Sequence, residues 1–200
     1  MAAYFKQKGW GACAIEPSKD SRAFQEKFGI TVLGDFVQDA DFASCAKFSF
    51  VSLSFVLEHL EDPIETIRQA YQALEPGGII MVSTPNDFSP GQLAFHDFYK
   101  EEYRWIFVPD HINYFDFHSL TALLKRAGFT IIRRTTDFPL EFLLLGGINY
   151  YANPEDQMKV NPFIQNFESA FKTTNKSKNL EDLYVGLAQQ GLDAAAYYMQ

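Results

Sequence analysis

The spacing of apolar residues along this chain alternates between the period of a strand and the period of a helix. The short apolar runs that predict strands are residues 12–15, 30–33, 48–55, 79–83, 129–134 and 194–199. Most of these runs are continuous, which is typical of strands buried on both faces of a sheet. The alternation of such runs with helical segments predicts an α/β fold.

The predicted helices carry recognisable start and stop signals. Ser18 is a suitable N-cap for a helix that runs to about Phe28, with Gly29 as its stop. Asp62 followed by Pro63 predicts another helix, which ends at the Pro-Gly-Gly of residues 76–78. Asp116 predicts the start of a third capped helix, and Gly128 its end. A strand, a capped helix and a second strand form a βαβ unit, which favours a parallel sheet.

After Pro139 the sequence becomes rich in aromatic residues, Asn and Pro. Helices are expected near residues 163–172 and 180–190, before the last predicted strand. Residues 139–191 are therefore predicted to form a helical cap insertion before the last strand, within a single domain of residues 1–200.

Composition and charge narrow the classes of function. The chain has 200 residues with 17 Lys and Arg against 25 Asp and Glu, a formal net charge of −8, and no basic block. A protein that binds nucleic acid by neutralising phosphates needs a basic surface, so nucleic acid is not an expected partner. Apolar runs are too short to span a bilayer, and no secretory signal is evident. Cys13 and Cys45 lack metal or redox spacing, so we expect reduced thiols in a cytoplasmic protein.

Ligands of doubly wound sheets bind beyond the carboxyl ends of the strands, so the residues there are candidates. Glu16 could accept both hydroxyls of a ribose, or it could be a carboxylate at the start of the helix that follows. Asp35 and Phe36 could hold the edge and face of a purine, or form an ordinary turn. Ser54 and Phe55 follow the third strand, where a bound nucleotide would pass.

The sequence of residues 52–63, which includes Leu57-Glu58-His59-Leu60 and Asp62-Pro63, resembles a segment of the class I S-adenosylmethionine-dependent methyltransferases. Residues 11–18, 74–86 and 110–129 resemble further segments of that family, in the family's order. The resemblance implies a Rossmann-like sheet, S-adenosylmethionine as cofactor, and Glu16 as its ribose-binding acid. The tail from Phe138 is similar to the cap of relatives that modify sugars or other small metabolites.

The sequence departs from the family at its beginning. Members open with a strand and an Asp-x-Gly-x-Gly loop, and no such loop occurs here. The sheet is therefore expected to lack its first, central strand, whose absence would leave hydrogen-bonding edges on its neighbours. We interpret the chain as a fragment or a truncated frame; alternatively, a partner or a missing N-terminal segment completes the sheet.

Histidine is the expected base if a hydroxyl accepts the methyl group. His59 and His111 are the candidates, by resemblance to segments that face the cofactor, although a lone histidine is often structural. Some relatives hold a divalent cation with a Glu-x-x-Glu-His set and a later histidine. Because Phe55 stands where the first Glu would be, we predict no metal, and we expect Glu58 to accept a hydrogen bond near the helix start.

The sequence leaves three functions open. The first is methyl transfer to O, N or C of a small-molecule acceptor, such as a sugar or related metabolite, by in-line displacement. The aromatic residues between 95 and 107 could wall an acceptor pocket or simply pack together. The second is an inactive remnant that serves as a binding subunit. The third, a nicotinamide-dependent oxidoreductase, is disfavoured because it needs the same absent glycine loop.

Overall fold

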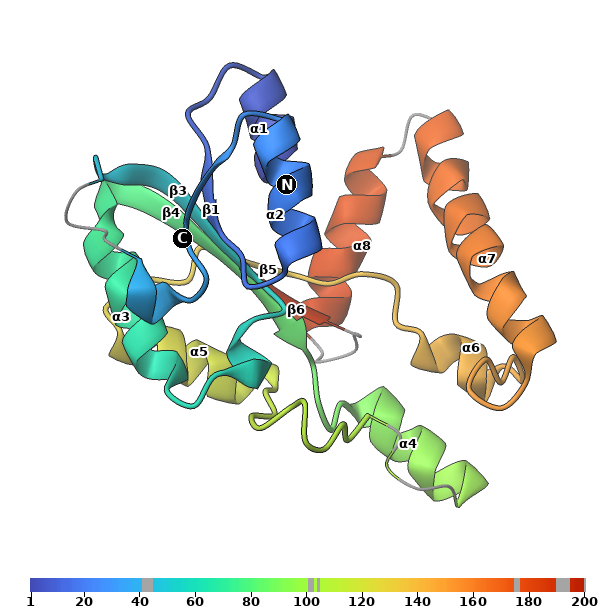
Figure 1. The fold of residues 1–200 in the computed structure, drawn as a ribbon. Coiled ribbons are helices and arrows are strands. Elements are labelled where there is room, and N and C mark those ends of the chain that lie inside the picture. The colour runs from blue at the N-terminus through green and yellow to red at the C-terminus, as the bar shows by residue number, and fades with distance from the viewer. Residues whose placement is uncertain (41–44, 101–102, 104, 175–176, 190–194, 200) are drawn as a thin grey trace. The chain divides into compact units, whose positions relative to one another are not determined.

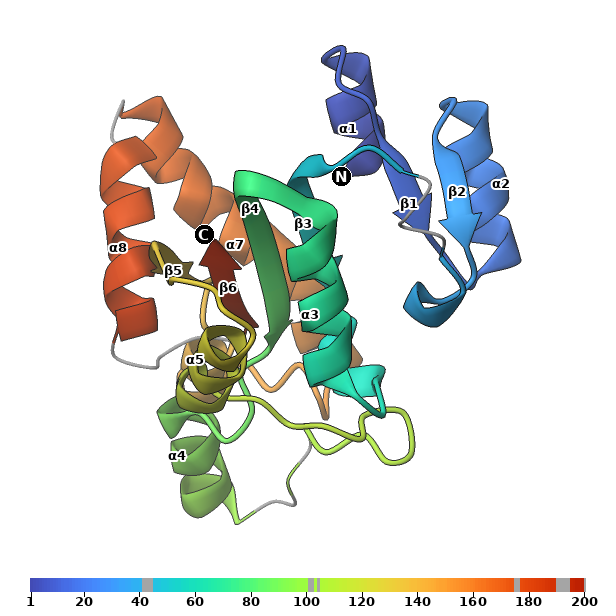
Figure 2. The same ribbon diagram turned by 90° about the vertical axis from the view of Figure 1, so that its left-hand side faces the viewer.

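A computed structural model describes residues 1–40, 45–100, 103, 105–174, 177–189 and 195–199. The chain divides into two compact units, Met1–Phe48 and Ser49–Gln200, which are described separately. Most of their helices and strands are labelled in Figure 1, and β2 is labelled in Figure 2. The prediction of one domain over residues 1–200 stays a prediction.

The first unit contains two helices and a pair of parallel strands. In chain order these are α1 (Ala2–Gln7), β1 (Cys13–Ile15), α2 (Lys19–Lys27), β2 (Thr31–Gly34) and the 3₁₀ turn η1 (Val37–Asp39). The strands pair in parallel, with Cys13 opposite Thr31. Ser18 caps α2 through its Oγ, which accepts a hydrogen bond from the backbone N–H of Ser21 at 3.4 Å. The predicted helix–strand order is confirmed here.

The second unit is built on a four-stranded sheet with the order β3-β4-β6-β5. The strands are β3 (Phe48–Ser54), β4 (Leu74–Pro85), β5 (Arg133–Thr135) and β6 (Ala195–Met199). β6 lies between β4 and β5 and is antiparallel to both (Figure 2). The helix α3 (Pro63–Ala73) joins β3 to β4 and packs on β4 and on α5 (Phe117–Arg126). This is the α/β organisation that the apolar pattern predicts.

Local capping chemistry sets the starts of the two core helices. The Oδ1 atoms of Asp62 and Asp116 accept hydrogen bonds from the third backbone N–H of their helices, at 3.1 and 2.7 Å. Each helix then turns its apolar stripe inward. The apolar residues that are 1% exposed or less in this core are Leu57, Ile67, Ile80, Val82, Leu120 and Leu124.

Two predicted strands have other boundaries. β4 begins at Leu74, not at residue 79, because Leu74 already has extended dihedral angles and Gly77 takes a positive φ of 81° within the strand. β5 begins at Arg133, not at residue 129. Phe129 is buried and packs edge-on against Tyr71 of α3, so the residues after it lead from helix to sheet before pairing starts.

Some helices were not predicted or were predicted too short. α4 (Pro90–Tyr99) has a capping box between Ser89 and Gln92, and α6 is Glu141–Leu145. α7 (Pro154–Thr173) begins well before residue 163, since Asn153 caps it and Pro154 suits its first turn. α8 is Ser177–Gln189. The predicted ends at Gln190, Gly191 and Ala194 lie outside the described residues.

The chain segment between β5 and β6 carries α6, α7 and α8. That these helices cap an acceptor site stays a prediction, as does the absence of a central first strand. In the part of the chain that the structure describes, none of the helices combines the length and apolarity needed to cross a bilayer.

Candidate functional site

The candidate base His59 lies on the turn that follows β3. After Ser54 the backbone of Phe55 takes a left-handed φ of 53°, and the 3₁₀ turn η3 (Leu57–His59) follows directly. A positive φ at a residue other than glycine is uncommon and often marks a functional turn. Leu57 is fully buried and anchors the turn, whereas the His59 side chain is 45% exposed.

Glu58 is a buried carboxylate beside this histidine. Its Oε2 accepts a hydrogen bond from Thr84 Oγ1 of β4 at 3.1 Å. The donor is therefore a strand residue and not the helix start that the sequence suggested. Its Oε1 has no hydrogen-bond partner among the described residues and lies 4.0 Å from His59 Nε2. The buried Glu58 carboxylate and the exposed His59 imidazole are therefore neighbours on one turn.

The hydrogen bond of His59 defines its tautomer. His59 Nδ1 lies 2.7 Å from the backbone oxygen of Asp110. A carbonyl oxygen can only accept, so Nδ1 carries the hydrogen in this bond. In the neutral ring Nε2 then keeps a free lone pair, which is the arrangement that a general base requires.

His111 lies against His59, although the two are far apart in the sequence. The rings contact edge to face with centroids 4.9 Å apart. Phe107 packs on the other side of His111 with a centroid distance of 5.4 Å, and the buried Nδ1 of His111 has no partner among the described residues. Thus the structure brings together the two histidines that the sequence singled out.

The segment of residues 110–115, called the strap below, crosses η3 and reaches the end of β4. At its far end Phe115 and Asp87 exchange hydrogen bonds. The Asp87 N–H donates to the Phe115 oxygen at 2.6 Å, and the Phe115 N–H donates to Asp87 Oδ2 at 3.2 Å. Burial raises the pKa of Asp87 to about 7, and the negative charge of Glu58 adds to this rise. Asp87 was not predicted as a site residue.

Two of the predicted cofactor residues also lie at the end of β3. Ser54 is the exposed last residue of the strand, with its Oγ 3.4 Å from Ser52 Oγ. Phe55 is 49% exposed, and its backbone N–H donates to the oxygen of Ser83 at 2.9 Å. An exposed aromatic ring and a hydroxyl at the carboxyl end of a strand are suited to contact a nucleoside.

The other predicted cofactor residues belong to the first unit. Glu16 Oε1 accepts from the Ser18 N–H at 3.0 Å and Oε2 from Gln25 Nε2 at 3.4 Å, so its hydrogen bonds are those of a carboxylate at a helix start. It also lines a cavity of about 440 Å³ together with Met1, Ala2, Ala3, Asp20, Ser21, Phe24, Gln25 and Ile30. Each carboxylate oxygen of Glu16 has a further lone pair, while the ribose-binding role stays a prediction.

Asp35 forms an ion pair with Arg22 of α2 at 2.6 Å. The Arg22 guanidinium holds the pKa of the Asp35 carboxyl below its usual range. Phe36 is 56% exposed, beside Asp35. A second cavity of about 730 Å³, between the end of α5, β5 and α8, contains none of the predicted site residues.

Glu58, His59 and His111 also form a cluster whose candidate ligand atoms lie within 4.8 Å of one another. Two nitrogens and one carboxylate are a poor match to Mg²⁺, which prefers oxygen ligands, and the side chain at position 55 is an apolar ring. The donor set therefore does not fit a magnesium-type site.

We expect calorimetric titration with Mg²⁺ or Mn²⁺ to give no saturable heat for this cluster. The matched variants are Glu58→Gln, in the cluster, and Glu61→Gln, an exposed neighbour. Saturable binding that Glu58→Gln removes and Glu61→Gln retains would show that the prediction of no metal is wrong.

Comparisons with known proteins identify the family of this chain. The sequence model of a family described as a methyltransferase domain matches residues 1–134. A Mycolicibacterium smegmatis protein described as an S-adenosylmethionine-dependent methyltransferase is 35% identical over 78 residues, covering 38% of this chain and 26% of that protein. A ubiquinone biosynthesis O-methyltransferase of Actinobacillus pleuropneumoniae is 31% identical over 77 residues, covering 36% of this chain and 33% of that protein.

The chain thus spans about a quarter to a third of the length of these two relatives. Among solved structures, one from Galdieria sulphuraria, described as a sarcosine dimethylglycine methyltransferase, superposes with a TM-score of 0.50 at 13% identity, covering 94% of this chain and 68% of that one. At this identity the likeness concerns the fold alone. The family match extends over most of the chain, and this chain belongs to the methyltransferase domain family, the class I S-adenosylmethionine-dependent group that its motifs resemble.

Proposed function

We propose that this chain is a methyltransferase domain that uses S-adenosylmethionine to methylate a small molecule, such as a sugar or related metabolite, on O, N or C. The observation that carries the proposal is the state of His59. Its Nδ1 hydrogen is committed to the Asp110 oxygen, and its Nε2 lone pair lies 4.0 Å from Glu58 Oε1. Such an imidazole is prepared to take a proton from an acceptor hydroxyl.

The proposal gives each candidate residue a role. When bound, S-adenosylmethionine would supply a methyl group, whose carbon the acceptor attacks in line as the sulfur leaves in S-adenosylhomocysteine. In the first unit, Glu16 would hold the ribose hydroxyls, and Asp35 and Phe36 would hold the purine. His59 Nε2 takes the proton that an acceptor hydroxyl loses, and Glu58 stabilises the resulting imidazolium. The name of the Actinobacillus relative, an O-methyltransferase, supports a hydroxyl acceptor.

Calorimetry with S-adenosylhomocysteine tests the proposal. We expect saturable heat, and we expect Glu16→Ala to weaken the affinity at least about tenfold, because a carboxylate that binds two ribose hydroxyls contributes more than 1.4 kcal/mol. Glu26→Ala, which removes an exposed carboxylate from the same helix region, is the matched control and should bind as the unmodified chain does.

Two outcomes would contradict these expectations. No heat at millimolar ligand, from a sample shown to be folded by circular dichroism, would exclude cofactor binding by this chain and favour the binding-subunit alternative. Unchanged affinity in a folded Glu16→Ala variant would remove Glu16 from the ribose-binding role while leaving cofactor binding intact.

A further inference from the structure

The turn η3 presents several backbone oxygens that its own residues do not fully satisfy. A 3₁₀ turn of three residues leaves most of its carbonyls without partners inside the turn. Such groups cost free energy when they are removed from water without a donor. In this protein the donors come from the strap, residues 110–115, and mainly from one residue of it.

Asn113 supplies three hydrogen bonds to this turn. Its backbone N–H donates to the oxygen of Glu58 at 3.1 Å. Its side-chain Nδ2 donates to the oxygens of Leu57 and Leu60, at 3.1 and 2.5 Å. The neighbouring N–H of Ile112 adds a second bond to the Glu58 oxygen at 2.9 Å. The half-buried Asn113 therefore joins three residues in and next to the turn to the strap.

The chemistry of these contacts requires an amide side chain. The Asn NH₂ group has two donor hydrogens on one atom, and each is used here for a different carbonyl. Aspartate has the same shape but no donor, and it would place a negative charge against carbonyl oxygens. Alanine would leave the two oxygens without this donor. The donors, and not the volume of the side chain, are therefore what Asn113 contributes.

The parts that Asn113 connects carry the candidate base and its neighbours. The turn holds Glu58 and His59, whereas the strap holds His111 and the Asp110 oxygen that accepts from His59 Nδ1 at 2.7 Å. If the strap moved away from the turn, His59 would lose that acceptor. The preference for the Nδ1–H form, which leaves Nε2 free, would be lost with it.

We propose that Asn113 is a positioning residue for the base: it clamps the strap to η3, which keeps His59 in the Nδ1–H tautomer and in contact with His111. This inference rests on the proposed function, since it assigns the tautomer a purpose in methyl transfer. The clamp itself is a property of the folded chain and can be measured without turnover.

The first experiment records the imidazole nitrogens of His59 and His111 by long-range ¹H–¹⁵N NMR. In the unmodified chain we expect His59 to be protonated at Nδ1 when neutral, with cross-relaxation between the two rings. In Asn113→Ala and Asn113→Asp we expect a shift toward Nε2–H and loss of that cross-relaxation. Asn113→Ser, which keeps one donor, should lie between them, and Asn166→Ala, an exposed site on α7, should match the unmodified chain.

The second experiment measures turnover on an acceptor found by screening small hydroxylated molecules. We expect Asn113→Ala to lower kcat by about 10- to 100-fold, because displaced supporting contacts typically cost this much, with an unchanged Kd for S-adenosylhomocysteine. The dependence of kcat on pH should also change, since a different nitrogen of His59 then titrates toward the acceptor.

The outcomes distinguish failure of the Asn113 clamp from failure of the proposed methyltransferase function. If folded Asn113→Ala, or Asn113→Ser where the alanine variant does not fold, keeps the tautomer and ring contact of the unmodified chain, the clamp is refuted. If the unmodified chain shows the expected NMR pattern but neither binds S-adenosylhomocysteine nor methylates any acceptor, the proposed function fails and the clamp stands as a structural device.

Discussion

Replacing His59 with asparagine is expected to lower kcat for methyl transfer to a hydroxyl by about 10²–10⁴-fold, the usual contribution of a positioned general base. Asparagine is chosen because its side-chain N–H can replace Nδ1–H as the donor to the Asp110 oxygen, while nothing replaces the lone pair of Nε2. The variant therefore removes the base and retains the hydrogen bond that holds the strap.

The measurement compares kcat, KM and S-adenosylhomocysteine binding in His59→Asn, His111→Asn and His118→Asn. His118 is exposed on α5 and serves as the matched control. A His59→Asn variant with kcat close to that of the unmodified chain would show that His59 is not the base. If His111→Asn alone then reduced kcat, the role would pass to His111, the second candidate from the sequence.

The features that the sequence predicts well depend on neighbouring residues. Asp62 and Asp116 mark the starts of α3 and α5 because an N-cap needs only a side-chain oxygen and an N–H three residues on. The same local signal was present at Ser89 and Gln92, whose capping box starts α4. The apolar pattern alone did not predict this helix.

The features that the sequence does not predict depend on distant partners. Of the strand expected over residues 129–134, only Arg133 and Arg134 pair with β6, and Thr135 beyond its predicted end pairs as well. The partner strand, and not the apolar pattern of these residues, decides which of them pair. In the site, the adjacent Glu58 and His59 follow from one motif. Their contact with His111 depends instead on the hydrogen bonds that the Asn113 side chain donates and on those between Asp87 and Phe115. No periodicity in the sequence encodes these hydrogen bonds.

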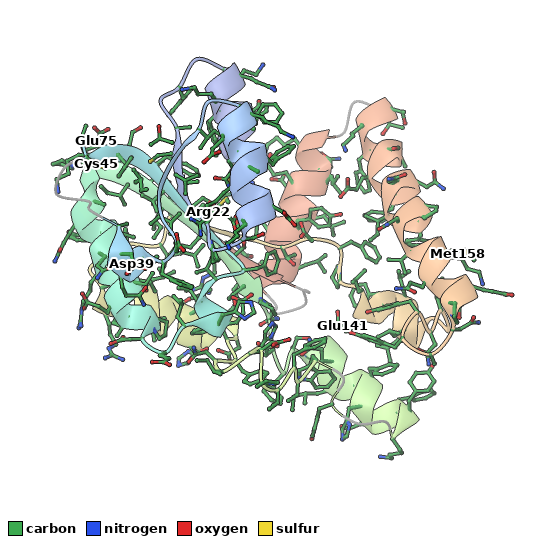
Figure 3. All side chains as sticks on the ribbon, in the orientation of Figure 1. Arg22, Asp39, Cys45, Glu75, Glu141 and Met158 are labelled. Carbon is green, nitrogen blue, oxygen red and sulfur yellow. The ribbon has the colours of Figure 1, made fainter. Side chains whose placement is uncertain are left out.

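A buried carboxyl lies at the contact between α4 and α6. Glu141, at the start of α6, is 7% exposed and lies against α4 (Figure 3). The contact is close, since a Cβ on Gly91 would lie 3.0 Å from Glu141 Cβ. Tyr99 of α4 adds a hydrogen bond from its hydroxyl to the Leu144 oxygen at 3.2 Å. Burial raises the pKa of Glu141 from 4.5 to about 7, although a hydrogen bond with Gln92 opposes the rise.

Stability is therefore expected to fall as the pH rises from about 4.5 to about 7. Between these values the folded chain holds a proton on Glu141 that the unfolded chain has released, so the unfolded state gains relative stability as protons are removed. A rise of this size corresponds to a loss of about 3 kcal/mol in the free energy of unfolding. The loss is absent below pH 4.5 and complete above pH 7. Asp87, whose pKa is also raised to about 7, adds a loss of the same sign.

Glu141→Gln isolates the contribution of this carboxyl because glutamine has nearly the same shape and no charge to bury. We expect its free energy of unfolding in urea to exceed that of the unmodified chain by up to about 3 kcal/mol at pH 8, and to match it near pH 4.5. Glu75→Gln, at an exposed position of β4, is the control and should change neither value. An equal effect of Glu141→Gln at both pH values would mean that hydrogen bonding and packing, and not ionisation, govern the contact between α4 and α6.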